Sequence, residues 1–219
     1  MSIVEQIGAH RQALLRGEVT CGVRRCPLCH GDPGAFSLHE RRRRGFWVVV
    51  ERVVEKVVSL LARWKCPLCR GTFTEYPAFA RPHKRYVASE IEGRSRNYMA
   101  DEDATYQKAA RDKAMAVCHP IESTTGRESH LCASTVWRWV GFLGKLKEAV
   151  RRAVRWVRQR DCRSAFPRSA YPVPARKYRS QARRQVLGRC LQLLALQDFL
   201  RRRFAVSIFP RSAIAASFT

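Results

Sequence analysis

Four cysteines in two pairs carry the most specific chemistry in this sequence of 219 residues. They lie in two nearly identical pieces, Cys26-Pro-Leu-Cys-His-Gly31 and Cys66-Pro-Leu-Cys-Arg-Gly71. In each piece two thiolates can hold one ion while nearby backbone N–H groups donate to sulfur. The proline is expected to fix the turn, and the glycine to allow a left-handed backbone. Together the pieces predict one closed, tetrahedral structural zinc site, with the ligands Cys26, Cys29, Cys66 and Cys69.

Two other uses of these cysteines have to be weighed. A thioredoxin-like Cys-x-x-Cys would lie where a strand meets a helix, and neither pair has that setting. Plain cysteines without metal are the remaining alternative. Four thiolates leave no coordination position for water, so catalytic zinc is not expected. His30 and Cys21 are spare donors near the first pair. A second group could in principle form another metal site, but its spacing matches no zinc knuckle and residues without metal are expected: Cys118, His119, His130 and Cys132.

Charge is the second strong feature of the sequence. Lys and Arg total 42 against 18 Asp and Glu, for a formal net charge of +24. Residues 138–219 alone hold 20 of the basic side chains and only 3 of the acidic ones. Such a surplus attracts polyanions, and it predicts a nucleic-acid partner. A hydrophobic content of 46% is too high for a disordered chain and predicts a packed core.

The segment Ser134–Val140 is predicted to open a DNA-reading helix. Ser134 can cap the helix, and the first turn of a recognition helix meets base edges. Arg138 is the candidate for a bidentate contact with guanine. The side chains expected to contact DNA are Ser134, Thr135, Arg138 and Trp139. The face expected to pack against the protein comprises Trp137, Val140 and Leu143.

Arginines after this segment predict a phosphate-facing surface that holds position without reading sequence. The residues are Arg151, Arg152, Arg155 and Arg158. Arg176–Arg184 and the Arg41–Arg44 run could serve in the same way. The alternative interpretation is an ordinary amphipathic helix with solvated arginines, and a solvated turn at Arg41–Arg44. Few acids accompany these cations, which favours a polyanion partner.

Helix and strand signals place these groups along the chain. Ser2 and Glu5 form a capping box that predicts a helix ending at Gly17. The valine-rich stretch 46–64 favours a β-hairpin leading into Cys66, although its valine doublets also permit a helix. Further helices are predicted at 83–92, 101–115 and 134–160, and another begins at Ser180. Gly93 is expected to end the first of these, and Gly141 or Gly144 to bend the third. Prolines predict a linker over 166–177.

These elements predict an α+β protein that is mainly α. The expected parts are an N-terminal helix (1–20), a zinc-ribbon domain (21–80), a helix-turn-helix-like DNA-binding domain (81–162), and a basic linker with a C-terminal helix (163–219). No apolar run approaches the length of a membrane span, and the N-terminus has no signal-peptide core. A soluble, cytoplasmic protein is therefore expected, nucleoid-associated if it is bacterial.

The stretch Arg63-Trp-Lys-Cys-Pro-Leu-Cys-Arg-Gly-Thr-Phe-Thr74, with Pro77, Pro82 and Tyr86 after it, resembles bacterial zinc-ribbon proteins associated with insertion sequences. Those proteins continue into a helix-turn-helix region, and Tyr106 through Val140 is similar to that part. The resemblance covers roughly residues 20–145. It implies DNA binding linked to transposition, as an accessory or regulatory factor or the DNA-binding part of a transposase.

A catalytic role is not expected. A metal-dependent transposase needs three converging acids, and the C-terminal third is too poor in acids to supply them. Neither a phosphate-binding glycine loop nor a nucleophile elbow is present in the sequence. The alternative function from another class is an RNA-binding or ribonucleoprotein component that uses the same charge.

Overall fold

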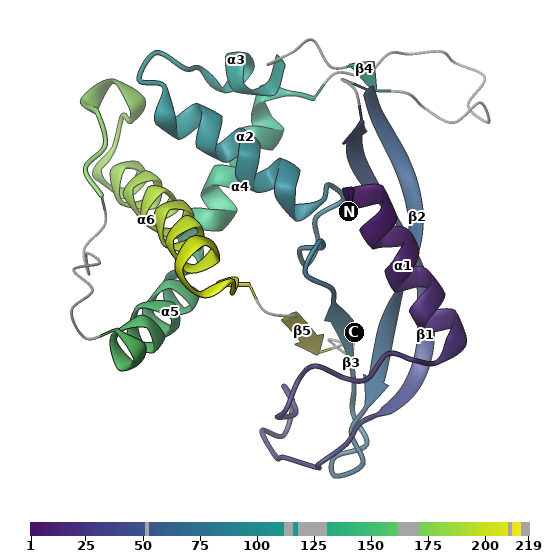
Figure 1. Cartoon of the computed structure of the whole chain (residues 1–219). Helices are drawn as coiled ribbons and strands as arrows, with labels where there is room; N and C mark the ends of the chain where they lie inside the picture. The colour runs from purple at the N-terminus through teal and green to yellow at the C-terminus, as the bar shows by residue number, and fades with distance from the viewer. Residues whose placement is uncertain (51–52, 112–115, 118–130, 162–170, 210–211, 216–219) are drawn as a thin grey trace. The chain divides into compact units, whose positions relative to one another are not determined.

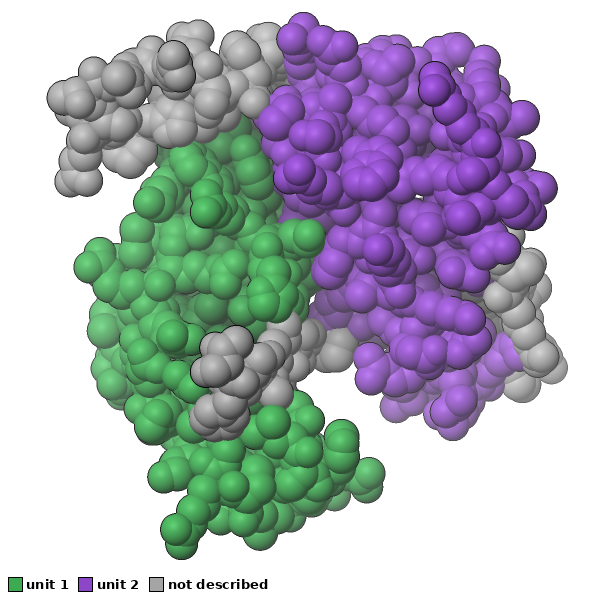
Figure 2. Space-filling view, turned by 180° about the vertical axis from the view of Figure 1, so that it is seen from behind, with its two compact units in different colours: residues 1–90, 116–129, 210–219 green, residues 91–115, 130–209 purple. Residues whose placement is uncertain are grey.

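The computed structural model describes residues 1–50, 53–111, 116–117, 131–161, 171–209 and 212–215 (Figure 1). The chain divides into two compact units (Figure 2). The sheet unit comprises Met1–Glu90, Ala116–Ser129 and Pro210–Thr219, and the helical unit comprises Ile91–Met115 and His130–Phe209. Helices and a sheet are both present, and they are largely segregated between the two units, which confirms the predicted mixed class.

Helix α1 (Ile3–Arg16) begins and ends where its local signals predict. The Ser2 hydroxyl accepts from the backbone N–H of Glu5 at 3.2 Å, and the Glu5 carboxylate accepts from the N–H of Ser2 at 2.7 Å. Gly17 ends the helix with φ 75°, a left-handed conformation that glycine adopts without strain. Ile7 and Leu14 are the fully buried residues of α1.

Strands β1 (Ser37–Val50) and β2 (Val53–Lys65) form one long antiparallel hairpin (Figure 1). Ser37 pairs with Lys65 at one end, and Val50 pairs with Val53 at the other. The predicted hairpin is confirmed, but β1 begins well before the valine-rich stretch and includes the Arg41–Arg44 run. Edge strands commonly carry exposed, charged side chains. The arginines of β1 are therefore compatible with a strand that pairs with a neighbouring strand on one side only.

Three shorter strands complete the sheet. They are β3 (Thr72–Tyr76), antiparallel to β2, β4 (Ala116–Val117), parallel to β2, and β5 (Ser212–Ala215), antiparallel to β3. The order β1-β2-β3-β5 leaves β1 at an edge. A segment at 85–87 covers part of that edge, because the Trp47 N–H donates to the Arg85 carbonyl at 2.9 Å and the Val87 N–H donates to the Trp47 carbonyl at 3.1 Å.

Two apolar clusters hold the sheet unit together, and α1 contributes one buried residue to each. Ile7 packs with Phe46, Val48 and Leu61 in what we call the Phe46 cluster. Leu14 packs in a second cluster, the Trp64 cluster, whose other buried members are Leu60, Ala62, Trp64 and Phe73. Helix α1 accordingly lies along the hairpin (Figure 1).

The described helices of the helical unit are residues 91–100 of α2 (Ala88–Ala100), α3 (Tyr106–Arg111), α4 (Ala133–Lys145), α5 (Lys147–Arg160) and α6 (Gln181–Phe204), with a 3₁₀ turn at Ala175–Lys177. Ser180 caps α6 as predicted, because its hydroxyl accepts from the N–H of Arg183 at 3.2 Å. Helix α6 runs on past Phe199 to Phe204. Most of the buried residues of α6 are leucines, so α6 is the central helix of this unit.

Two predicted helices have wrong limits. The helix expected at 83–92 is instead α2, which starts at Ala88 and continues through Gly93. Buried Ile91, Tyr98 and Met99 explain this, because burial on both sides of a glycine outweighs its weak local preference to end a helix. The helix expected at 101–115 is the shorter α3, and the end of that prediction lies outside the described residues.

The long helix predicted from Ser134 to Arg160 is two helices. They meet at Leu146, whose ψ of 48° breaks the helical path, rather than at Gly141 or Gly144. Ser134 is not the cap of α4, because Cys132 occupies that position and its side chain makes no capping bond. Gly144 serves packing instead: a Cβ there would lie 2.1 Å from the Val186 carbonyl oxygen of α6.

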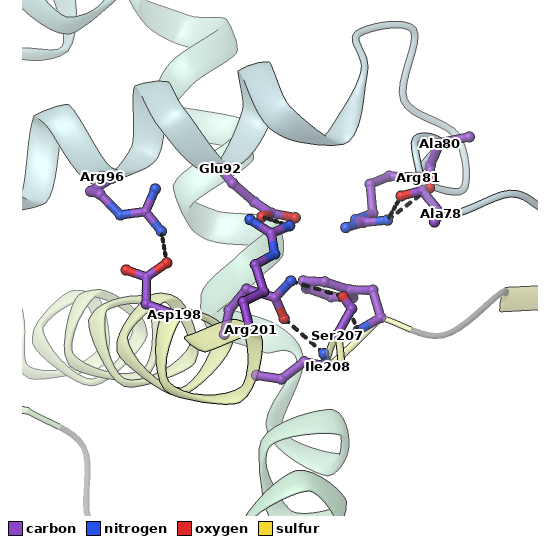
Figure 3. A network of polar contacts seen from close by, with 11 residues as sticks. Ala78, Ala80, Arg81, Glu92, Arg96, Asp198, Arg201, Ser207 and Ile208 are labelled. Atoms are coloured by element: carbon purple, nitrogen blue, oxygen red, sulfur yellow. Dashed lines mark hydrogen bonds and ion pairs between the residues drawn. The ribbon is translucent and has the colours of Figure 1, made fainter. Parts of the chain in front are cut away.

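Ion pairs and a buried amide fasten α6 within the helical unit (Figure 3). Arg96 pairs with Asp198 at 2.8 Å, and Arg201 pairs with Glu92 at 3.1 Å, which ties α6 to α2. The fully buried Gln197 accepts from the N–H of Ile208 at 2.7 Å and donates to the Ser207 hydroxyl at 2.8 Å. Buried polar groups are thus satisfied where the chain leaves α6.

None of the described helices combines the length and the apolar character that crossing a membrane would require.

Candidate metal centre

The two Cys-x-x-Cys pieces fold into loops with the same backbone hydrogen bonds. In the first, the Cys26 N–H donates to the Gly31 carbonyl and the His30 N–H donates to the Cys26 carbonyl, each at 2.9 Å. In the second, Cys66, Gly71 and Arg70 repeat both bonds at 2.9 Å. Each loop is a tight turn closed on its own first cysteine. We call them knuckle loops 1 (26–31) and 2 (66–71).

The glycines of these loops have a different role from the one predicted. The left-handed residues are His30 and Arg70, each with φ 59°, rather than Gly31 and Gly71. A Cβ at Gly31 would lie 2.8 Å from the Leu68 side chain, and one at Gly71 would lie 2.4 Å from that of Leu28. The leucine of each loop therefore packs on the glycine of the other, and the two loops form a reciprocal pair.

The four sulfurs meet at one point with the spacing that a tetrahedral metal requires. For sulfurs about 2.3 Å from a tetrahedral ion such as zinc, neighbouring sulfurs lie about 3.8 Å apart. The Cys26 and Cys69 sulfurs are 3.8 Å apart, those of Cys29 and Cys66 are 3.9 Å apart, and all four lie within 4.8 Å of one another. The predicted ligand set can hold one metal ion.

The hairpin explains how ligands so distant in sequence come together. Knuckle loop 1 lies before β1 and knuckle loop 2 directly follows β2, so pairing of Ser37 with Lys65 brings the loops to the same end of the hairpin (Figure 1). The Trp64 cluster supports this end, with Cys21, Val23 and Phe36 packed against it. The residues between the two cysteine pairs, which were predicted to include extended strands, form this hairpin.

Burial differs within each pair in the same way. Cys26 and Cys66 are buried, at 1% and 0% exposed, whereas Cys29 and Cys69 face solvent. Burial of the Cys26 thiol opposes its ionisation, but the Cys29 and Leu28 backbone and neighbouring thiols outweigh it and lower the pKa to about 7. The Gly71 N–H lowers the pKa of Cys69, but desolvation and bonds to the other thiols raise it to about 11. Cys26 is therefore the thiol that ionises more readily of these two.

The spare donors lie outside this cluster. His30 is exposed, and the Cys21 thiol lies 3.7 Å from the Val23 carbonyl oxygen, so neither belongs to the group of four among the described residues. Of the second group considered in the sequence, Cys118, His119 and His130 lie outside the described residues. Cys132 is described, and it is exposed at the start of α4.

The predicted DNA-contacting residues of α4 are only partly on one surface. Ser134 and Arg138 are exposed and Thr135 is half-buried. The two tryptophans have exchanged places relative to the prediction: Trp139 is 3% exposed, and Trp137 is 50% exposed. The buried face is Val136, Trp139, Val140 and Leu143, whose spacing of three, four and seven residues defines one side of a helix. The prediction that Trp139 contacts DNA is therefore wrong.

Arg183 of α6 belongs to the Arg176–Arg184 stretch that was predicted to face phosphates, but its contacts with aromatic side chains were not predicted. Its guanidinium lies 4.9 Å from the centre of the Trp137 ring and hydrogen-bonds the Tyr106 hydroxyl. The contact joins α3, α4 and α6. Local sequence holds no signal for it, because its partners are far apart in the chain.

Three of the four predicted arginines of α5 line one groove, and Arg152 is not among them. Arg151, Arg152 and Arg155 are exposed, and Arg158 is half-buried. Arg151, Arg155 and Arg158 line a groove of about 570 Å³ together with Val150, Val154 and Gln159. A Glu148 carboxylate pairs with Arg151 at 2.6 Å. The groove therefore has an apolar floor and cationic walls.

Residues 26–116 match a protein family described as a domain of unknown function (DUF6431), which is less than half of the chain. The matched stretch begins at Cys26, includes both knuckle loops and the hairpin, and ends before α4. Neither the curated proteins nor the solved structures yielded a match.

Proposed function

We propose that this chain is a zinc-containing protein that binds duplex DNA, with zinc ordering the sheet unit and the helical unit contacting the DNA. The observation that carries the proposal is the row of arginines on α5. Arg151, Arg155 and Arg158 line one groove, and Glu148 is the only acid that α5 contains. A cationic surface with so little compensation favours a polyanion, and phosphates of a duplex would neutralise it.

Zinc is the proposed metal because four cysteine thiolates in a tetrahedral arrangement suit zinc or an iron–sulfur centre. The sulfur spacing near 3.8 Å supports a single ion rather than a larger cluster. Four protein ligands fill the coordination sphere, so the role proposed is structural. Binding would then contribute directly to the folding free energy of the knuckle loops.

Sequence reading is assigned to the first turns of α4. Ser134 and Arg138 are exposed there, and Arg138 can reach base edges in the manner of a recognition helix. Trp137 takes the place that the sequence assigned to Trp139, because half of its surface is exposed. Arg183 beside Trp137 adds a cation at the same surface.

The biological setting proposed is a mobile element, in which the chain acts as an accessory or regulatory factor or as the DNA-binding part of a transposase. Its support is the resemblance of the cysteine-containing stretch and the following helices to zinc-ribbon proteins of insertion sequences. A transposase would then be a partner, and the nucleoid the place of action.

Salt dependence tests the proposal on the full chain with labelled duplex DNA. We expect the affinity to fall steeply with salt, with a log–log slope of about −3 or steeper for three or more phosphate contacts. Structured RNA at equal salt is the second arm. A flat salt profile would refute the proposal, and tighter binding of RNA would favour the ribonucleoprotein alternative.

Two single variants separate the proposed roles. Arg138→Ala should reduce the preference for a selected sequence, by about 1–3 kcal/mol of discrimination. Arg155→Ala should weaken binding to all sequences alike and reduce the salt slope by about 1. Sequences obtained by selection on the wild-type chain provide the targets. Equal losses on every sequence for both variants would show that α4 does not read bases.

A further inference from the structure

Residues of β1, β2 and β3, together with Arg85, line a concave site of about 590 Å³ that lies wholly in the sheet unit and that the proposed duplex contacts do not use. Its cationic lining residues are Arg42, Arg43, Arg44, Lys56 and Arg85. None of the residues that line it is acidic. Five cations around one concavity, with no acid among them, repel one another, and an anionic occupant would relieve that repulsion.

The walls of this site are fixed by contacts around the edge of β1. The Arg44 guanidinium donates to the Lys84 carbonyl at 3.1 Å and lies 5.5 Å from the centre of the Tyr76 ring. The Lys56 side chain lies against Gly45, where a Cβ would come within 2.6 Å of its Cε atom. Glycine at 45 therefore leaves room for a lysine from β2 to lie over β1.

Three of the cations have exposed side chains for which the described residues provide no partner. Within the described part of the chain, Arg43, Lys56 and Arg85 form neither an ion pair nor a side-chain hydrogen bond, and all three are exposed. Arg42 pairs with Glu40 at 3.6 Å, outside the lining. The three unpaired cations are therefore the ones available to phosphate groups.

The cations are spread along the strand instead of converging on one point. The three unpaired ones extend from Arg43 to the level of Trp47, which pairs with Lys56 and whose N–H bonds to the Arg85 carbonyl. Four strand steps of about 3.4 Å make this row about 14 Å long. A row of that length suits several successive phosphates better than one compact anion.

An aromatic ring lies among these cations. Trp47 lines the site, is half-buried, and has its indole stacked on Tyr86 with the ring centres 6.3 Å apart. A cationic groove with aromatic side chains is the combination by which proteins hold single strands, because phosphates track the cations and bases stack on the rings.

We infer that this site binds single-stranded nucleic acid, through phosphate contacts to Arg43, Lys56 and Arg85 and base stacking near Trp47. The site lies in a different unit from α4 and α5. It stands whether or not those helices bind duplex DNA.

The test uses the full, metal-loaded chain and a labelled oligothymidylate of about 12 nucleotides, within the range that single-strand-binding folds cover. The pocket variant carries Arg43→Gln, Lys56→Gln and Arg85→Gln. The matched control removes the same charge from the helical unit by Arg151→Gln, Arg152→Gln and Arg155→Gln. We expect the pocket variant to bind the oligomer about 10- to 100-fold more weakly than the wild type, with a salt slope reduced by about 2. The control variant should lose less than about threefold in affinity for the same oligomer.

Three further outcomes would change the assignment of the site. Equal losses for both variants would mean that only the overall charge attracts the strand, and would overturn the inference. An abasic oligomer with the same phosphates should bind at least about fivefold more weakly, and equal binding would remove the stacking role. Free thymidine triphosphate that competes as tightly as the oligomer would assign the site to a nucleotide instead.

The single variant Arg43→Gln, with an expected loss of about threefold, replaces the triple variant if circular dichroism shows that the latter does not fold. Duplex binding separates this inference from the proposed function. The pocket variant should keep duplex affinity, and the helical-unit variant should lose it. A helical-unit variant with unchanged duplex affinity would refute the proposed function and leave the single-strand site intact.

Discussion

Cys66 shows how one residue joins the hairpin to the metal centre. It follows directly after β2, its N–H donates to the Gly71 carbonyl at 2.9 Å, and its sulfur lies 3.9 Å from that of Cys29. It is fully buried. A hydroxyl in its place would be a much poorer ligand for a soft metal, and the three remaining thiolates would be left with an open position.

Cys66→Ser should therefore lower the metal content below one ion per chain and lower the melting temperature. The matched control is Cys21→Ser, whose thiol lies outside the cluster of four and is only half-buried. Metal content by mass spectrometry on protein purified without chelator, with thermal unfolding beside it, measures both. One zinc per chain in Cys66→Ser, with an unchanged melting curve, would contradict a four-cysteine structural site.

At the scale of elements, the contact between α4 and α6 depends on the position of a single glycine. Gly144 lies where α4 touches Val186, and a Cβ there would come within 2.7 Å of the Val186 side chain as well as 2.1 Å of its carbonyl oxygen. Gly141, one turn earlier, has Arg183 Nη1 at 3.7 Å as its nearest neighbour, which is an ordinary contact. The two glycines of one helix therefore differ in what an added methyl group would meet.

Gly144→Ala should lower the free energy of unfolding by about 1–3 kcal/mol, because backbone cannot move aside as a flexible side chain can. Gly141→Ala is the matched control, and it should raise that free energy by about 0.5–1 kcal/mol through better helix propensity. Urea unfolding followed by circular dichroism compares them. A stabilised Gly144→Ala variant would show that α4 does not pack on α6 as described.

At the scale of the whole molecule, the two units depend on different forces. The sheet unit combines a four-thiol site with two apolar clusters, whereas the helical unit combines a leucine-rich α6 with ion pairs such as Arg96–Asp198. The Phe46 cluster contains none of the knuckle-loop residues. Metal should therefore control the end of the hairpin next to the knuckle loops more than the rest of the chain.

Removing the metal with a chelator should accordingly have a local effect in hydrogen exchange. The amides of Cys26, His30, Cys66 and Arg70, which close the knuckle loops, should lose protection. Those at the centre of α6 should keep it. Added zinc should restore the original pattern. Uniform loss of protection across both units would mean that the metal holds the whole molecule together, and no change anywhere would mean that it holds nothing.

Local patterns determined a good part of this protein from the sequence alone. The capping box at Ser2, the cap at Ser180 and the hairpin before Cys66 follow from short-range backbone geometry, and each is present as predicted. The cysteine ligands belong to the same class, since a Cys-x-x-Cys turn places two thiols together without help from the rest of the fold. Spacing within a few residues carries this information.

Only the tertiary structure decided which groups far apart in the chain meet. It buried Trp139 rather than Trp137, placed Leu28 and Leu68 on each other's glycines, and brought Lys56 and Arg85 beside the arginines of β1. The physical reason is that such contacts depend on the fit of side chains from several segments, and the burial of the whole core sets that fit. The metal ligands can be predicted from the sequence, whereas the surfaces around them depend on the folded chain.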